Sequence, residues 1–327
     1  MSRLLSRYAE AIYWLARYVE RTENMARILD VHETFSRDSR GGQNWASVTQ
    51  LYANEAAFAE RYDSPSAENV LTFYLIDEEN PGSVLSSVRA VRENARTLRP
   101  LISTEMWIQI NTFHNAMRAL RPEDIAEERL ARLCARIKEA CQAHTGITEG
   151  TFYRDEGWYF YQIGRSLERA DQVTRLLDVK YHLLLPDVEA VGSPLDVSQW
   201  NAVLRSTAGY HAFRRVQPSG MKAERVAEFL LFDRCFPRSV WASVAAANTY
   251  MTDLKSRYTL RGGSRAMEHL DELRAVLDNE PVERILKRGL HEFIDGVQII
   301  LIKANQAIGE DFFGWQALPE SGQSQIA

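Results

Sequence analysis

A pattern of arginine and glutamate at helical spacing occurs twice in the sequence and is its best candidate for chemistry. Residues 17–27 read RYVERTENMAR, and residues 165–175 read RSLERADQVTR. At 100° per residue, the arginines and the glutamate of each copy fall on one face of a helix, with apolar residues roughly opposite. Guanidinium groups bind carboxylates and phosphates through paired hydrogen bonds, and a neighbouring carboxylate can orient them or transfer a proton. The pattern therefore predicts an anion-binding site, with catalysis there as a further option.

The candidate site residues come from both copies and from the segments before them. Glu20 and Glu168 are the predicted acid/base residues. The predicted ligand-binding residues are Tyr13, Arg17, Arg21, Asn24, Arg154, Tyr161, Arg165, Arg169 and Gln172. A structural interpretation stays open beside the functional one, because a fully hydrogen-bonded network of these side chains would fix the register of two helices. The pattern has two arginines for each glutamate, and this excess of positive charge slightly favours an anionic ligand.

Other kinds of site find little support in the sequence. The seven histidines are scattered, no Glu-x-x-His pair suits a bundle metal site, and neither GxxxxGK[ST] nor GxGxxG occurs. We therefore predict no metal and no cofactor. A net charge of −5 argues against nucleic-acid binding.

The sequence also predicts a cytoplasmic protein without a membrane span. Three cysteines without CxxC spacing favour a reducing compartment. Charges interrupt the first segment, which is therefore unlike a signal peptide, and the most apolar run, VQIILI at 297–302, is too short to cross a bilayer.

The elements that must position these residues are all helices. Nearly every long segment has helical periodicity, and none shows sustained strand alternation. About twelve helices are predicted, at 3–36, 44–62, 67–77, 81–98, 102–119, 123–144, 152–184, 196–213, 222–233, 237–255, 265–278 and 281–308. Asn80 followed by Pro81 predicts a capped helix start at that point.

The repetition extends beyond the arginine–glutamate pattern. FYLIDEENPGSV at 73–84 matches FLLFDRCFPRSV at 229–240, and NWASV at 44–48 matches QWNAV at 199–203. Blocks in the same order predict an internal duplication: a first helical repeat at 1–150, a second at 151–315 and a flexible tail at 316–327. We expect one compact bundle whose halves are related by a pseudo-two-fold axis, with the two charged helices meeting across it.

The quoted segments resemble the alpha-E family, bacterial helical domains named for an ER motif. The motif stands here as YWLARYVERTENMARILDV at 13–31 and GRSLERADQVTRLLDV at 164–179, and WNAVLRSTAGYHAFRR at 200–215 looks like a further block. The resemblance implies a place beside ATP-grasp amide-ligase-like and transglutaminase-like proteins, in a system that makes or modifies peptides. It implies no reaction for this component.

Three functions follow from residues and resemblance together. The first is a component of such an amide-forming system, which binds a ligase partner and an anionic peptide or amino-acid ligand in the arginine-lined seam. The second is an enzyme that uses Glu20 or Glu168 as acid/base beside an arginine clamp. The third is a structural scaffold. The first two functions predict an open cleft with more arginines than carboxylates, whereas a scaffold predicts a closed and charge-balanced seam.

Overall fold

The computed structural model describes residues 4–38, 45–183, 194–218 and 220–316, and within them it contains fifteen α-helices and no strand. The predicted all-α class is confirmed. Most of the predicted tail, residues 317–327, lies outside the described residues. The division into two repeats with an internal duplication stays a prediction.

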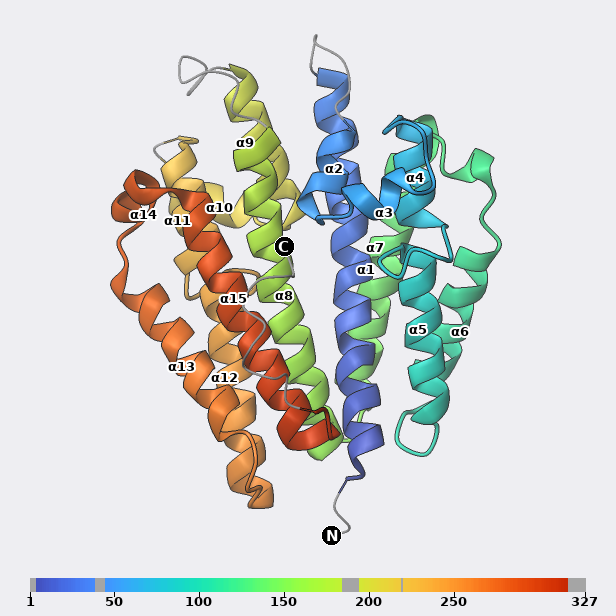
Figure 1. The fold of residues 1–327 in the computed structure, drawn as a ribbon, viewed down its shortest axis with the longest axis vertical. Coiled ribbons are helices and arrows are strands. Elements are labelled where there is room, and N and C mark those ends of the chain that lie inside the picture. The colour runs from blue at the N-terminus through green and yellow to red at the C-terminus, as the bar shows by residue number, and fades with distance from the viewer. Residues whose placement is uncertain (1–3, 39–44, 184–193, 219, 317–327) are drawn as a thin grey trace.

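Two long helices form the centre of the bundle, α1 (Ser6–Asp38) and α8 (Glu156–Leu183). They lie side by side in the middle of Figure 1 and run in the same direction. Their contacts show the parallel register, since Leu4 meets Glu156 and Glu20 meets Arg169 further along both helices. Gly164 lets them approach closely, because a Cβ atom at this position would stand 2.5 Å from the carbonyl oxygen of Tyr13.

The remaining helices flank this central pair. On one side are α2 (Ala46–Leu51), α3 (Glu55–Ala59), α4 (Ala67–Leu75), α5 (Val84–Thr97), α6 (Thr104–Arg118) and α7 (Glu127–Thr151). On the other side are α9 (Pro194–Ser206), α10 (Tyr210–Val216), α11 (Ala223–Phe232), α12 (Val240–Tyr258), α13 (Ser264–Asn279), α14 (Val282–Arg288) and α15 (Leu290–Ile308). A π-helical turn, Gly309–Phe313, follows α15. Because neighbours surround it, α1 buries polar side chains as well as apolar ones.

The structure has more helices than predicted because three predicted helices are each broken in two. The segment 44–62 breaks at Ala53, 196–213 breaks at Ala208, and 281–308 breaks at Gly289. All three residues have positive φ, of 49°, 57° and 119° respectively, which no α-helix accommodates. Glycine adopts such angles readily, but alanine does so at a cost, and for that reason the first two breaks carried no sequence signal.

The predicted cap at Asn80 was also wrong in detail. Helix α5 begins three residues later, and its N-cap is Ser83, whose hydroxyl accepts from the Ser86 amide at 3.1 Å. Asn80 instead closes the preceding turn by accepting from the Gly82 amide. Ser239 caps α12 in the same way as Ser83 caps α5.

Candidate functional site

The two charged helices pair reciprocally across the centre of the bundle. Arg21 of α1 donates to Glu168 of α8 at 2.8 Å, and Arg169 of α8 donates to Glu20 of α1. Each glutamate thus receives the arginine that follows the other glutamate in sequence. The four predicted arginines do not converge in one pocket, however; they are distributed over separate groups of contacts.

The first group, the Glu168 cluster, is built by α1, α8 and α15. Its members are Tyr13, Arg17, Arg21, Glu168, Gln172 and Asn305. The Glu168 carboxylate accepts from Arg17 Nε at 2.7 Å, from Arg21 Nε at 2.8 Å and from Gln172 Nε2 at 3.0 Å. The Tyr13 hydroxyl donates to Asn305 Oδ1 at 2.6 Å, and Arg17 donates to the same oxygen. Both oxygens of Glu168 are therefore fully used.

Glu168 is held in its ionised form. Its side chain is completely buried, which alone would raise its pKa, but the charges of Arg21 and Arg17 and their hydrogen bonds outweigh burial and lower the pKa to about 2. A general acid needs a pKa near the working pH. The physical state of Glu168 thus fits an anchor for guanidinium groups better than a proton donor, while its predicted acid/base role stays untested.

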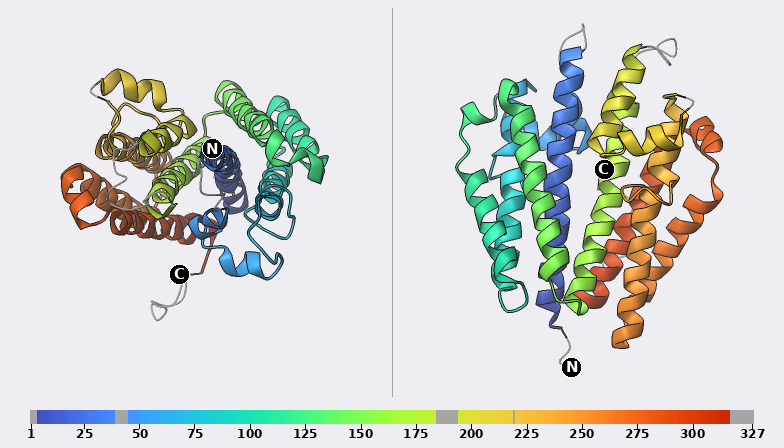
Figure 2. Two further views of the ribbon diagram at one scale, coloured as in Figure 1. Left: turned by 90° about the horizontal axis from the view of Figure 1, so that it is seen from above. Right: turned by 180° about the vertical axis from the view of Figure 1, so that it is seen from behind.

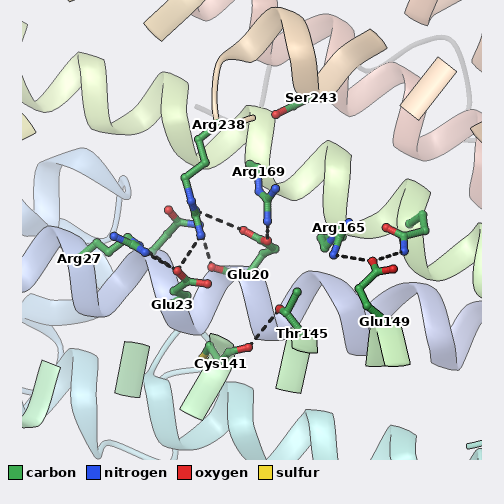
Figure 3. A network of polar contacts seen from close by, with 12 residues as sticks. Glu20, Glu23, Arg27, Cys141, Thr145, Glu149, Arg165, Arg169, Arg238 and Ser243 are labelled. Carbon is green, nitrogen blue, oxygen red and sulfur yellow. Dashed lines mark hydrogen bonds and ion pairs between the residues drawn. The ribbon is translucent and has the colours of Figure 1, made fainter. Parts of the chain in front are cut away.

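The second group, the Glu20 cluster, lies between α1, α8 and the turn before α12 (Figure 3). Its members are Glu20, Glu23, Arg27, Arg169 and Arg238. Glu23 Oε1 accepts from Arg27 Nε at 3.0 Å and from Arg238 Nη2 at 2.6 Å. Burial raises the pKa of Glu20, but Arg169 and Arg238 outweigh it, so that the net shift is downward.

The Glu20 cluster is less completely bonded than the Glu168 cluster. Among the described residues, the buried Glu20 Oε2 and Arg169 Nε have no hydrogen-bond partner, and Arg238 Nη1 is 3.8 Å from Glu20 Oε2. The predicted ligand residue Asn24 is turned inward and donates to the backbone oxygen of Glu20 at 2.8 Å. Unsatisfied buried groups are costly, which makes this carboxylate the better base candidate of the two.

The other predicted residues gather around Glu149 at the α7–α8 junction. Glu149 Oε1 accepts from Gln162 Nε2 at 2.8 Å and from Arg165 Nη1 at 3.3 Å. Arg165 also lies over the Tyr161 ring, 6.0 Å from its centroid. Arg154 is largely exposed and reaches Glu149 only at 3.9 Å. These three predicted residues therefore form a group of their own.

The Glu168 and Glu20 clusters face different sides of the central pair. Seen along the bundle, α15 and α7 lie on opposite sides of α1 and α8 (Figure 2, left). The Glu168 cluster includes Asn305 from α15. The Glu20 cluster lies towards α7, whose Cys141 is drawn beneath it in Figure 3. Glu20 and Glu23 add to burial in raising the pKa of the Cys141 thiol.

Sequence reasoning did not identify Asn305, Arg238, Glu149 or Glu23 as members of these groups. Arg238 lies in the repeated block at 229–240, but the matching residue of the first block is Gly82. A search for repeated residues therefore passes over it. Asn305 and Glu149 lie outside the repeated blocks.

The arginines of the Glu168 cluster are not fully hydrogen-bonded within the described residues. Arg17 Nη2 and Arg21 Nη1 form no hydrogen bond within the described part of the chain, and their side chains are 12% and 27% exposed. Aromatic rings lie against them, Trp14 at 4.8 Å from Arg17 Cζ and Tyr18 at 5.6 Å from Arg21 Cζ. Two guanidinium groups thus share one buried carboxylate and lie beside aromatic rings.

Two kinds of site receive no support from the described residues. No three histidine, cysteine, aspartate or glutamate side chains among them are grouped as metal ligands. None of the described helices combines the length and the apolar character that crossing a membrane requires.

Comparison with known proteins places the chain in a family. It is similar to the uncharacterized protein Rv2567 of Mycobacterium tuberculosis (24% identity over 317 residues) and to the uncharacterized protein Mb2597 of Mycobacterium bovis (25% over 317 residues). Each match covers 89% of this chain but only 35% of the relative, so the chain spans about a third of their length. No solved structure matches it. The model of a predicted alpha-helical domain with a conserved ER motif matches residues 4–313, and the chain therefore belongs to the Alpha-E family.

Proposed function

We propose that this protein binds a carboxylate-bearing peptide or amino acid at the Glu168 cluster, as the non-ligase component of a bacterial amide-forming or amide-modifying system. The observation that carries the proposal is that Arg17 Nη2 and Arg21 Nη1 form no hydrogen bond with the described residues, on side chains that are partly exposed. Glu168 already fixes the orientation of both guanidinium groups, so little side-chain entropy would be lost when a ligand binds.

The charge of the site supports an anionic ligand. Two arginines share the single negative charge of Glu168, and the neighbouring Arg175 is already paired with Asp171 at 2.9 Å. One positive charge is left over. A ligand carboxylate would satisfy it through charge-assisted hydrogen bonds, which are stronger than neutral ones.

The proposed partners are an ATP-grasp amide-ligase-like protein and a transglutaminase-like protein. Their association rests on the family resemblance. The length of the relatives adds support for a component role, because there the matched region occupies only 35% of a longer chain. A pull-down with an ATP-grasp protein encoded beside this one tests the partnership, and absence of any interaction at micromolar concentration would count against it.

Calorimetric titration tests the ligand site. We expect triglutamate to bind the wild type, triglutamine to bind at least about tenfold more weakly, and Arg21→Gln to lose about tenfold in affinity, which corresponds to one charge-assisted contact. Arg61→Gln is the matched control, because Arg61 is 28% exposed and pairs with Asp77 at 2.8 Å, away from the seam. Equal affinity in both variants would refute the site.

Each alternative function has one observation in its favour. Complete bonding of Glu168 suits a scaffold whose polar seam sets the register of α1 and α8. Glu20 Oε2 accepts no hydrogen bond from the described residues and has Arg238 only at 3.8 Å, which suits an enzyme with Glu20 as base. If triglutamate does not bind, the scaffold is the preferred function. If the protein converts a bound ligand to product, and Glu20→Gln abolishes this conversion but not ligand binding, the protein is an enzyme.

A further inference from the structure

The outer face of α6 and α7 carries an apolar groove, and none of its lining residues belongs to the Glu168 or Glu20 cluster. The groove encloses about 440 Å³. Phe113, Ala116 and Met117 of α6 form one wall, and Ala140 and Ala143 of α7 form the other. On the same face Ile108 is 58% exposed. Small residues on adjacent helices leave room for the side chains of a partner, and an exposed isoleucine beside them is a side chain that such a groove fits.

We propose that this face is the interface of a symmetric homodimer, in which α6 and α7 of one copy pack antiparallel on α6 and α7 of a second copy. A two-fold interface must be self-complementary, because the same surface is used by both copies. The face meets this condition twice, once in charge and once in shape.

The charge condition is met by Arg136 and Glu139 on α7. Both are exposed, and neither forms an ion pair or side-chain hydrogen bond with another described residue. They lie three residues apart, so an axis crossing α7 midway between them places Arg136 of each copy opposite Glu139 of the other. Two equivalent ion pairs, each between Arg136 of one copy and Glu139 of the other, would then flank the axis.

The shape condition follows from the register of the two helices. Gln109 Nε2 donates to the carbonyl oxygen of Ala140 at 2.8 Å, which fixes which residues of α6 and α7 are level. The axis that passes between Arg136 and Glu139 therefore passes between Asn111 and Thr112 of α6. About that axis Ile108 of one copy lies over Asn115 and Ala116 of the second copy, at the groove.

Light scattering after size-exclusion chromatography, across a range of micromolar concentrations of the full chain, tests the proposal. We expect a dimer for the wild type. Arg136→Glu and Glu139→Arg should each shift the chain to monomer, because each reversal opposes like charges across the axis. The double variant R136E/E139R should restore the dimer, since it re-creates both pairs with exchanged signs. All the altered side chains are exposed, so folding is not at stake.

The apolar contact has its own pair of variants. Ile108→Asp should weaken the dimer, whereas Ile299→Asp, at a residue of α15 that is 52% exposed, should leave it unchanged. A wild type that stays monomeric at every concentration would overturn the proposal and would leave a different protein as the occupant of the groove. A dimer that is indifferent to the charge reversals would overturn it as well. Neither result bears on the anion site of the Glu168 cluster.

Discussion

Replacing Glu168 by glutamine should destabilise the protein by about 3 kcal/mol at neutral pH. The folded state lowers the pKa of Glu168 from 4.5 to about 2. A shift of this size means that the ionised carboxylate is favoured over a neutral group by about 3 kcal/mol, at ~1.4 kcal/mol per unit. Glutamine keeps the size of the side chain but removes the charge, and its amide directs a donor at the two arginines. The estimate falls within the range for breaking a buried ion pair.

Glu20→Gln is the matched comparison, and it should cost clearly less. Glu20 accepts a hydrogen bond from one arginine, and among the described residues its other oxygen has only the longer ion pair with Arg238 at 3.8 Å. Glu168, in contrast, accepts from two arginines and a glutamine. The free energy of unfolding of the three proteins, measured with denaturant and followed by circular dichroism, gives both differences directly.

The dependence on pH provides an independent check. Because the folded-state pKa of Glu168 is depressed, its contribution is fully present above the unfolded value near pH 4.5 and is lost as the pH falls towards 2. The difference between wild type and Glu168→Gln should therefore shrink over that window. A loss below about 1 kcal/mol at neutral pH, or a larger loss for Glu20→Gln, would refute the assignment of Glu168 as the better-bonded carboxylate.

Three further outcomes follow from packing and burial. Gly164→Ala should cost about 1–3 kcal/mol in unfolding free energy, because the added methyl group meets the backbone of α1 at 2.5 Å. Gly146→Ala, in α7 with nothing within 4 Å of the new atom, should instead stabilise by roughly 0.5–1 kcal/mol, and the same denaturant titration measures both. A thiol reagent should modify the exposed Cys235 well before Cys134 and Cys141, whose thiol pKa values burial raises; fast reaction of all three would show that α7 opens readily.

Helical periodicity was sufficient to predict the fold class and the long central helices. The amphipathic pattern of 17–27 and 165–175 also identified the faces that meet, because retained charges on a helix face indicate a partner for that face. The spacing of residues along one helix does not reveal which residues of the other helix they contact. The exchange of arginines between Glu20 and Glu168 depends on the parallel register of α1 and α8, which a glycine contact helps to set.

The parts that sequence reasoning missed have identifiable physical causes. The breaks at Ala53 and Ala208 depend on backbone angles that alanine rarely adopts, so local propensity gave no warning. Asn305 and Glu149 join their clusters through tertiary packing of α15 and α7, and no periodicity along the chain relates them to the charged helices.

The difference between the two clusters leads to a last prediction, at Arg238. In the first repeated block the corresponding residue is Gly82, so the turn before α5 offers no arginine, whereas Arg238 in the turn before α12 reaches Glu23 at 2.6 Å. Arg238→Gly turns the second block from PRS into PGS, as in the first. It removes one positive charge from the Glu20 cluster and leaves Arg27 and Arg169 balanced by Glu23 and Glu20.

If the positive charge left over is what binds a carboxylate, this neutral cluster should not become a second site. The stoichiometry of triglutamate in a calorimetric titration should stay at one per chain. The cost of losing one arginine from a shared carboxylate should be about 1–3 kcal/mol, which unfolding of the variant measures separately. A folded variant that binds two triglutamates would show that exposure of the guanidinium groups, and not the charge left over, decides where a carboxylate binds.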